Sequence, residues 1–94
     1  REAGGSAPRV PEVMEPPVDV FDEEQQVTIV ADVPGVNLED LELKIEGNTF
    51  CISTKATAPR SYRKELTLEA DVEPEGLQAT CHNGVLEIHL PKRS

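Results

Sequence analysis

The chain has 94 residues, about the size of one domain, and a chain this short buries only about two thirds of its unfolded surface. Its formal net charge of -9 repels the backbones of nucleic acids and anionic lipid surfaces. No apolar run approaches the roughly 20 residues that span a bilayer, and the N-terminus lacks the apolar core of a signal peptide. We therefore expect a cytoplasmic protein with no nucleic acid partner and no membrane insertion.

The composition also limits the core and the cysteine chemistry. With three aromatic residues and no Trp, the core must come from Val, Leu and Ile, which favour β structure. Small secreted scaffolds usually carry more than two cysteines, so Cys51 and Cys81 are expected as free thiols. Because the chain starts at Arg1 rather than Met, we expect a fragment of a longer protein.

Residues 1–17 are predicted to form a flexible, Pro/Gly-rich arm. They hold four of the eight prolines and two glycines, and they show no apolar periodicity. Order is expected to begin at Pro16-Pro17, so the folded domain is placed at residues 18–92.

From Val18 onward, apolar and polar residues alternate in short stretches, as in half-buried strands. A first strand at 18–20 is followed by a polar turn over 22–26. The second strand ends at Pro34-Gly35, because proline cannot donate to a ladder and glycine accepts turn geometry. Its inward residues are Val27, Ile29, Ala31 and Val33.

A hairpin is expected next, with its reversal at Gly47-Asn48. Its first strand alternates apolar with charged residues, and its second continues the inward pattern. The inward residues are Leu41, Leu43 and Ile45 on one strand and Phe50 and Ile52 on the other.

The rest of the chain continues this pattern. A polar loop at 54–61 leads to a strand with Leu66 and Leu68 inward, and 71–76 holds one short helical turn. The last hairpin turns at Asn83-Gly84 and ends at Pro91; its inward residues are Leu77, Ala79, Cys81, Leu86, Ile88 and Leu90. No segment has a 3.6-residue period, so we predict an all-β, two-sheet sandwich of about seven antiparallel strands.

No catalytic, metal-binding or cofactor-binding site is expected. A zinc site needs four converging Cys or His ligands, whereas Cys51 and His89 point outward and Cys81 inward. Cys81 and His82 are adjacent on a strand and so face opposite ways, which argues against a nucleophilic dyad. The chain also lacks both glycine-rich phosphate-loop motifs.

Two segments resemble the α-crystallin domain of the small heat shock protein (Hsp20) family. The first is ADVPGV at 31–36, followed by the alternation of 39–45. The second is similar to the family's C-terminal signature and comprises Ala79, Asn83, Gly84, Val85, Leu86, Ile88, Leu90, Pro91 and Lys92. The resemblance covers 18–92 and implies an immunoglobulin-like β-sandwich that works, without enzymatic activity, as an ATP-independent holdase for unfolding proteins.

The family resemblance also implies a groove that accepts a hydrophobic tail or a client segment. Carried over to this chain, the groove would be lined by Leu41, Leu43, Ile45, Leu77, Ala79 and Cys81. Each of these side chains could instead simply belong to the core.

The chain departs from the family in three places. The loop at 54–61 is too short to carry the extra strand that family members exchange to dimerise, and Lys64 stands where an arginine is usual. The printed sequence also holds no Ile-x-Ile-type tail after its last strand. We therefore expect a monomer or weak dimer for this fragment, and an oligomer for a full-length form.

Two hypotheses follow. In the first, the chain is the core of a small heat shock protein that binds aggregation-prone clients, as the C-terminal signature favours. In the second, which the short loop favours, it is an Hsp20-like or p23/CS-like module, such as a domain of an ArsA/Get3-type ATPase, that docks one specific partner.

Overall fold

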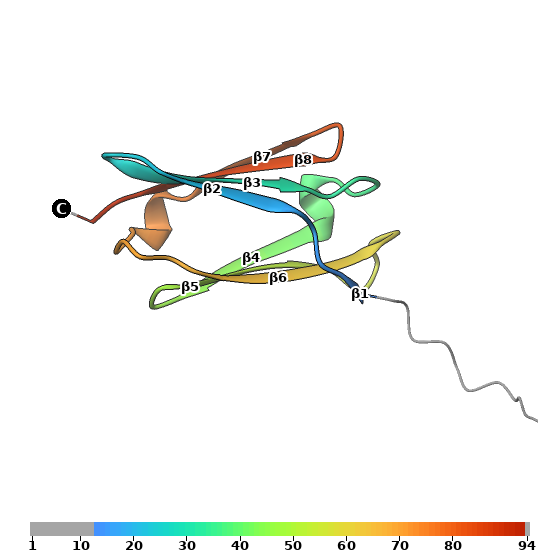
Figure 1. The fold of residues 1–94 in the computed structure, drawn as a ribbon. Coiled ribbons are helices and arrows are strands. Elements are labelled where there is room, and N and C mark those ends of the chain that lie inside the picture. The colour runs from blue at the N-terminus through green and yellow to red at the C-terminus, as the bar shows by residue number, and fades with distance from the viewer. Residues whose placement is uncertain (1–12, 94) are drawn as a thin grey trace, which may run out of the picture.

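The computed structural model describes residues 13–93, which form two four-stranded sheets packed face to face (Figure 1). One sheet has the strand order β1-β6-β5-β4 and the other β2-β3-β8-β7. The strands are β1 (Val13–Met14), β2 (Val18–Asp22), β3 (Gln26–Asp32), β4 (Leu41–Glu46), β5 (Thr49–Thr54), β6 (Ser61–Thr67), β7 (Gln78–His82) and β8 (Val85–Pro91). The predicted all-β sandwich is confirmed.

The core is built from the alternating residues that the sequence pattern turned inward. On β3 and β8, which are paired along their whole lengths, every second side chain is buried, and Thr28 of β3 is buried in addition. Phe50 and Ile52 of β5 face them from the other sheet and are 0% exposed. The buried set common to both sheets includes Val27, Ile29, Ala31, Val33, Phe50, Ile52, Tyr62, Leu68, Leu86, Ile88 and Leu90.

Both predicted hairpin turns are present. Gly47 has a φ of 59° in the β4–β5 turn, and Asn83 and Gly84 have φ values of 52° and 78° in the β7–β8 turn. A two-residue turn with positive φ at both positions matches the right-handed twist of the strands it joins, and Asn-Gly accepts that geometry at low cost. These turns fix the register in which apolar side chains share the inner face.

The folded part of the chain begins before the predicted boundary at Val18. Val13–Met14, expected within the arm, forms β1, which pairs parallel to β6 through Ser61 and Tyr62. Lys64 of β6 also lies 3.1 Å from Glu15 in an ion pair. The sandwich therefore has eight strands rather than seven, one pair of them parallel, while residues 1–12 of the predicted arm lie outside the described residues.

Two short 3-10 turns connect the sheets, one of them unexpected. The turn at Pro74–Gly76 agrees with the predicted helical turn, whereas Leu38–Asp40, labelled η1, was not predicted. A backbone N–H of Asn37 donates to the Asp40 carboxylate at 2.9 Å, which closes η1 just before β4 begins. Three residues are too few for a helical period to show in the sequence.

The two family-like segments meet in space at Pro34. The backbone N–H of Val33 donates to the carbonyl of Gly84 at 2.6 Å, and the Tyr62 hydroxyl donates to the carbonyl of Pro34 at 2.7 Å. Pro34-Gly35 therefore joins the β7–β8 turn of one sheet to β6 of the other.

Candidate functional site

One side of the sandwich is bounded by two edge strands, β4 and β7. Within the described residues, β4 pairs only with β5, and β7 only with β8. Turn η1, which leads into β4, contacts β7 and so brings the two edges to the same side of the molecule. Such edges present unpaired backbone N–H and C=O groups, which can pair with an extended segment of another chain.

The six predicted groove residues all lie on or beside these two strands, and five of them are incompletely buried. Leu41 is 7% exposed and belongs to the core. The other five are half-buried side chains that pack against the core while keeping part of their surface exposed: Leu43, Ile45, Leu77, Ala79 and Cys81. The structure thus places partly exposed apolar side chains along both edges, while Leu41, the first residue of β4, is buried in the core.

Cys81 is tied to the loop that precedes β4. Its thiol donates to the carbonyl of Val36 across 3.7 Å. Burial, and secondarily the negative charge of Asp40, raise the pKa of the Cys81 thiol, so the neutral form is favoured. Cys81 therefore acts as a small apolar residue here, as its inward pattern indicated.

Sequence reasoning missed the contribution of the 33–40 loop to this side of the molecule. Val36 is 3% exposed and Leu38 is 40% exposed, and both precede β4 next to β7. No alternation marks them, because they lie in a loop between two turns. Val36 belongs to the family-like segment 31–36, whereas Leu38 had no signal beyond its apolar character.

An apolar hollow, also missed, lies on the opposite side of the sandwich. It has a volume of about 390 Å³ and opens between β2 and the end of β6; its lining is Val20, Asp22, Val27, Leu66, Thr67, Leu68, Glu69 and Ala70. Val20 is 46% exposed although it belongs to an alternating strand. The alternation of β2 indicated a half-buried strand, and nothing in it indicated that the Val20 side chain would stay exposed to solvent.

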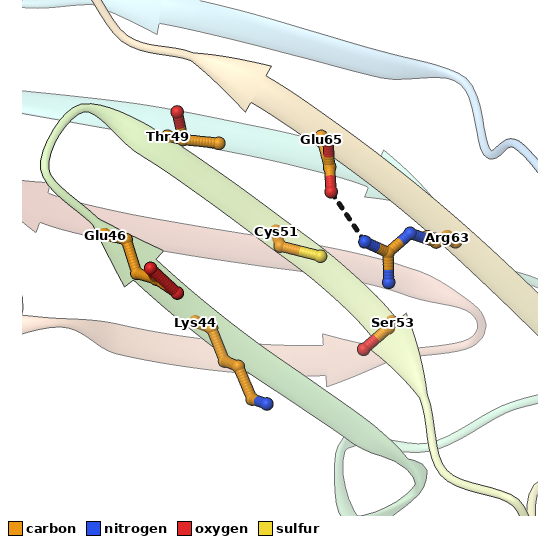
Figure 2. Close-up of a pocket in the computed structure, with 7 residues that line it drawn as sticks. All are labelled: Lys44, Glu46, Thr49, Cys51, Ser53, Arg63 and Glu65. Carbon is orange, nitrogen blue, oxygen red and sulfur yellow. Dashed lines mark hydrogen bonds and ion pairs between the residues drawn. The ribbon is translucent and has the colours of Figure 1, made fainter.

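The outer face of β4, β5 and β6 carries a shallow polar groove of about 530 Å³ (Figure 2). Cys51 lies at its centre, between Lys44 of β4 and Glu65 of β6, which confirms that it points outward. An ion pair of 2.6 Å joins Arg63 to Glu65. Both cysteines are free thiols, as expected.

The histidines do not converge. His82 pairs with Val85 and His89 with Gln78, at different positions along the hairpin. His89 Nδ1 lies 3.2 Å from the Thr28 hydroxyl, and its Nε2 lies 3.0 Å from Glu87. Residues 13–93 contain no group of three or more Cys, His, Asp or Glu side chains placed to hold a metal ion. Across the same part of the chain, no helix has the length and apolar character needed to cross a membrane.

Comparison with known protein families gives a match over most of the chain. The sequence profile of the Hsp20/alpha crystallin family matches residues 19–94. A probable 15 kDa heat shock protein of Leptospira interrogans is 30% identical over 94 residues, which cover 86% of this chain and 72% of that protein. A chloroplastic small heat shock protein of Oxybasis rubra is 29% identical, with 79% of this chain and only 40% of that protein covered.

Solved structures agree on the fold. The hspA structure from Xanthomonas axonopodis superposes with a TM-score of 0.73 at 26% identity, covering 84% of this chain and 94% of that one. Heat shock protein 16.0 of Schizosaccharomyces pombe reaches a TM-score of 0.74 at 23% identity, with coverages of 84% and 87%.

Proposed function

This chain belongs to the Hsp20/alpha crystallin family, and from that membership we propose that it is an ATP-independent holdase whose β4 and β7 edges bind unfolding proteins. The family is one of chaperones that act on unfolded proteins and form oligomers. What we propose for this chain is the mode of action: capture of extended apolar segments at the open side between β4 and β7.

The observation that carries the proposal is the coincidence of apolar surface and unpaired backbone on that side. Leu43 and Ile45 of β4 and Ala79 of β7 each keep part of their side chain exposed, as does Leu77 just before β7, and within residues 13–93 both strands have one unpaired edge. An unfolding chain can add a strand through its backbone and place alternate apolar side chains against these residues. The acidic remainder of the surface favours solubility of the resulting complex.

The alternative, docking of one specific partner, rested on the short loop between β5 and β6. The structure gives this loop residues 55–60, as short as expected. The loop bears on how copies of the chain associate, however, and not on what the β4 and β7 edges bind. No observation on these edges favours a single partner over many, so the holdase is retained.

The proposal is tested by aggregation of a thermally unfolding enzyme, followed by light scattering with and without the chain. We expect suppression by the wild type and its loss in Leu43→Gln, which places an amide among the apolar groups of the β4 edge while nearly preserving side-chain volume. The matched control is Val85→Gln, an apolar-to-amide change at a residue that is 44% exposed on β8. Thermal melts of both variants show whether they are folded at the assay temperature. If folded Leu43→Gln protected the enzyme as well as the wild type does, the β4 edge would not be the binding site.

A further inference from the structure

The outer face of β4, β5 and β6 has a charge pattern that is complementary to itself. Strand registers arrange nine outward side chains in three rows: Glu42, Ser53 and Arg63; Lys44, Cys51 and Glu65; Glu46, Thr49 and Thr67. The central column, on β5, holds only short neutral side chains. The flanking columns alternate in sign, negative-positive-negative on β4 and positive-negative-neutral on β6.

We propose that this face associates with the same face of a second copy, about a two-fold axis that runs along β5. Rotation about such an axis places β4 of one copy over β6 of the other without shifting the rows. Glu42 then faces Arg63 of the partner subunit, and Lys44 faces Glu65 of the partner subunit. The symmetry repeats both contacts, giving four opposite-charge pairs around a central column of Ser53, Cys51 and Thr49.

The charge pattern also selects the direction of the axis. An axis in the same plane but perpendicular to β5 would place Glu42 over Glu46 of the partner subunit, and Lys44 over Lys44 of the partner subunit. Like charges at such distances repel, so this second arrangement is disfavoured. Of these two axes, only the one along β5 brings opposite charges together in the first two rows, and it leaves Glu46 opposite the neutral Thr67 of the partner subunit.

Two copies of this acidic chain can approach each other at this face with little electrostatic repulsion. The chain as a whole has a formal net charge of -9, whereas the nine residues carry two cations and three carboxylates. Lys44 has no ion-pair partner within residues 13–93 and is exposed, so it is available to a carboxylate of another copy.

The size of the face makes the association weak. Three strands about 4.8 Å apart, with five residues each at about 3.3 Å, cover roughly 240 Å² per copy. Stable interfaces bury about 800 Å² per partner. The dimer should therefore form at high concentration and low salt, which fits the expected monomer or weak dimer.

Sedimentation equilibrium over a concentration series tests the proposal. We expect a monomer–dimer equilibrium in the wild type that weakens as salt approaches about 1 M, where the Debye length is about 3 Å. Glu42→Arg should lower the association constant about tenfold, since two attractive pairs become repulsive. The double variant Glu42→Arg with Arg63→Glu should restore it.

The matched control is Glu24→Arg, which makes the same charge change at an exposed turn residue between β2 and β3. Both single variants lower the net negative charge equally, so general repulsion predicts stronger association for both. Only the proposed face predicts that Glu42→Arg dissociates while Glu24→Arg does not. A wild type that stays monomeric throughout, equal behaviour of the two single variants, or failure of the double variant to restore association would each overturn the proposal.

Cross-linking provides a readout of geometry. Cys51 lies on the proposed axis, so in a Cys81→Ser chain a short bismaleimide should join the two Cys51 thiols of a dimer. The yield should fall on adding Glu42→Arg and recover in the double variant. A yield that does not respond to these changes would show that the contact lies elsewhere.

Discussion

Gly84 shows how one residue holds the β7–β8 turn against the chain that leaves β3 of the same sheet. A Cβ at this position would lie 2.8 Å from the Cα of Pro34, and the φ of Gly84 is positive at 78°. The carbonyl of the same residue accepts the N–H of Val33 at 2.6 Å. The glycine therefore satisfies both the turn and the close approach of the chain that follows β3.

Gly84→Ala should separate these two roles when compared with Gly47→Ala. Both glycines have positive φ, but a Cβ on Gly47 has no neighbour within 4 Å. Backbone strain alone predicts a loss of about 1–2 kcal/mol for each. The contact with Pro34 should add about 1–3 kcal/mol for Gly84→Ala. Thermal or urea unfolding measures the difference, and equal losses in the two variants would contradict the contact.

Leu86 tests the inward assignment on β8. It is 0% exposed, whereas its neighbour Val85 is 44% exposed on the same strand. Leu86→Asp buries an unpaired carboxyl and removes an apolar side chain, so we expect a loss above about 4 kcal/mol. Val85→Asp also replaces an apolar side chain by a carboxylate, but outside the core, and should lower the free energy of unfolding far less. Cooperative melting of Leu86→Asp near the wild-type temperature would show that the side chain is not buried.

At the scale of single elements, strand alternation and turn chemistry predicted most of the fold. Seven strands, their inward residues and the Asn83-Gly84 turn follow from patterns that span neighbouring residues. β1 could not be predicted, because a two-residue strand has no alternation and exists only through its pairing with β6. The contact between β7 and the loop before β4 could not be predicted either. It joins Cys81 to Val36, which lie 45 positions apart in the sequence.

The packing of β7 against that loop predicts a pH-dependent thiol. Burial and Asp40 raise the pKa of Cys81, so the folded chain keeps the proton at a pH where an unfolded chain has lost it. The unfolded state then binds fewer protons, and the stability contributed by this group declines as pH rises above about 8.5, the ordinary pKa of a cysteine. In a Cys51→Ser chain, alkylation by iodoacetamide should have a midpoint at higher pH in the native state than in urea. Equal midpoints would mean that Cys81 is not shielded.

At the scale of the whole molecule, the candidate binding side was predicted only in part. Family resemblance supplied six residues on or beside β4 and β7, and five of them have exposed surface. Leu38 adds exposed apolar surface to the same side, and the hollow beside Val20 lies on the other. These additions depend on which side chains the two sheets leave uncovered. Exposure of that kind is decided by contacts between distant segments, and no local pattern encodes it.

The connection between β5 and β6 sets how copies of this molecule can exchange. Six residues reach at most about 20 Å when extended, and a loop that must leave and return reaches about half that distance. A five-residue strand alone is about 17 Å long, so this loop cannot lend one to a neighbour. An assembly of these sheets therefore cannot depend on a strand exchanged through the β5–β6 loop. The exchange of subunits should then not require this loop and its two strands to separate from their own sheet, so it should be faster than the opening of the sandwich.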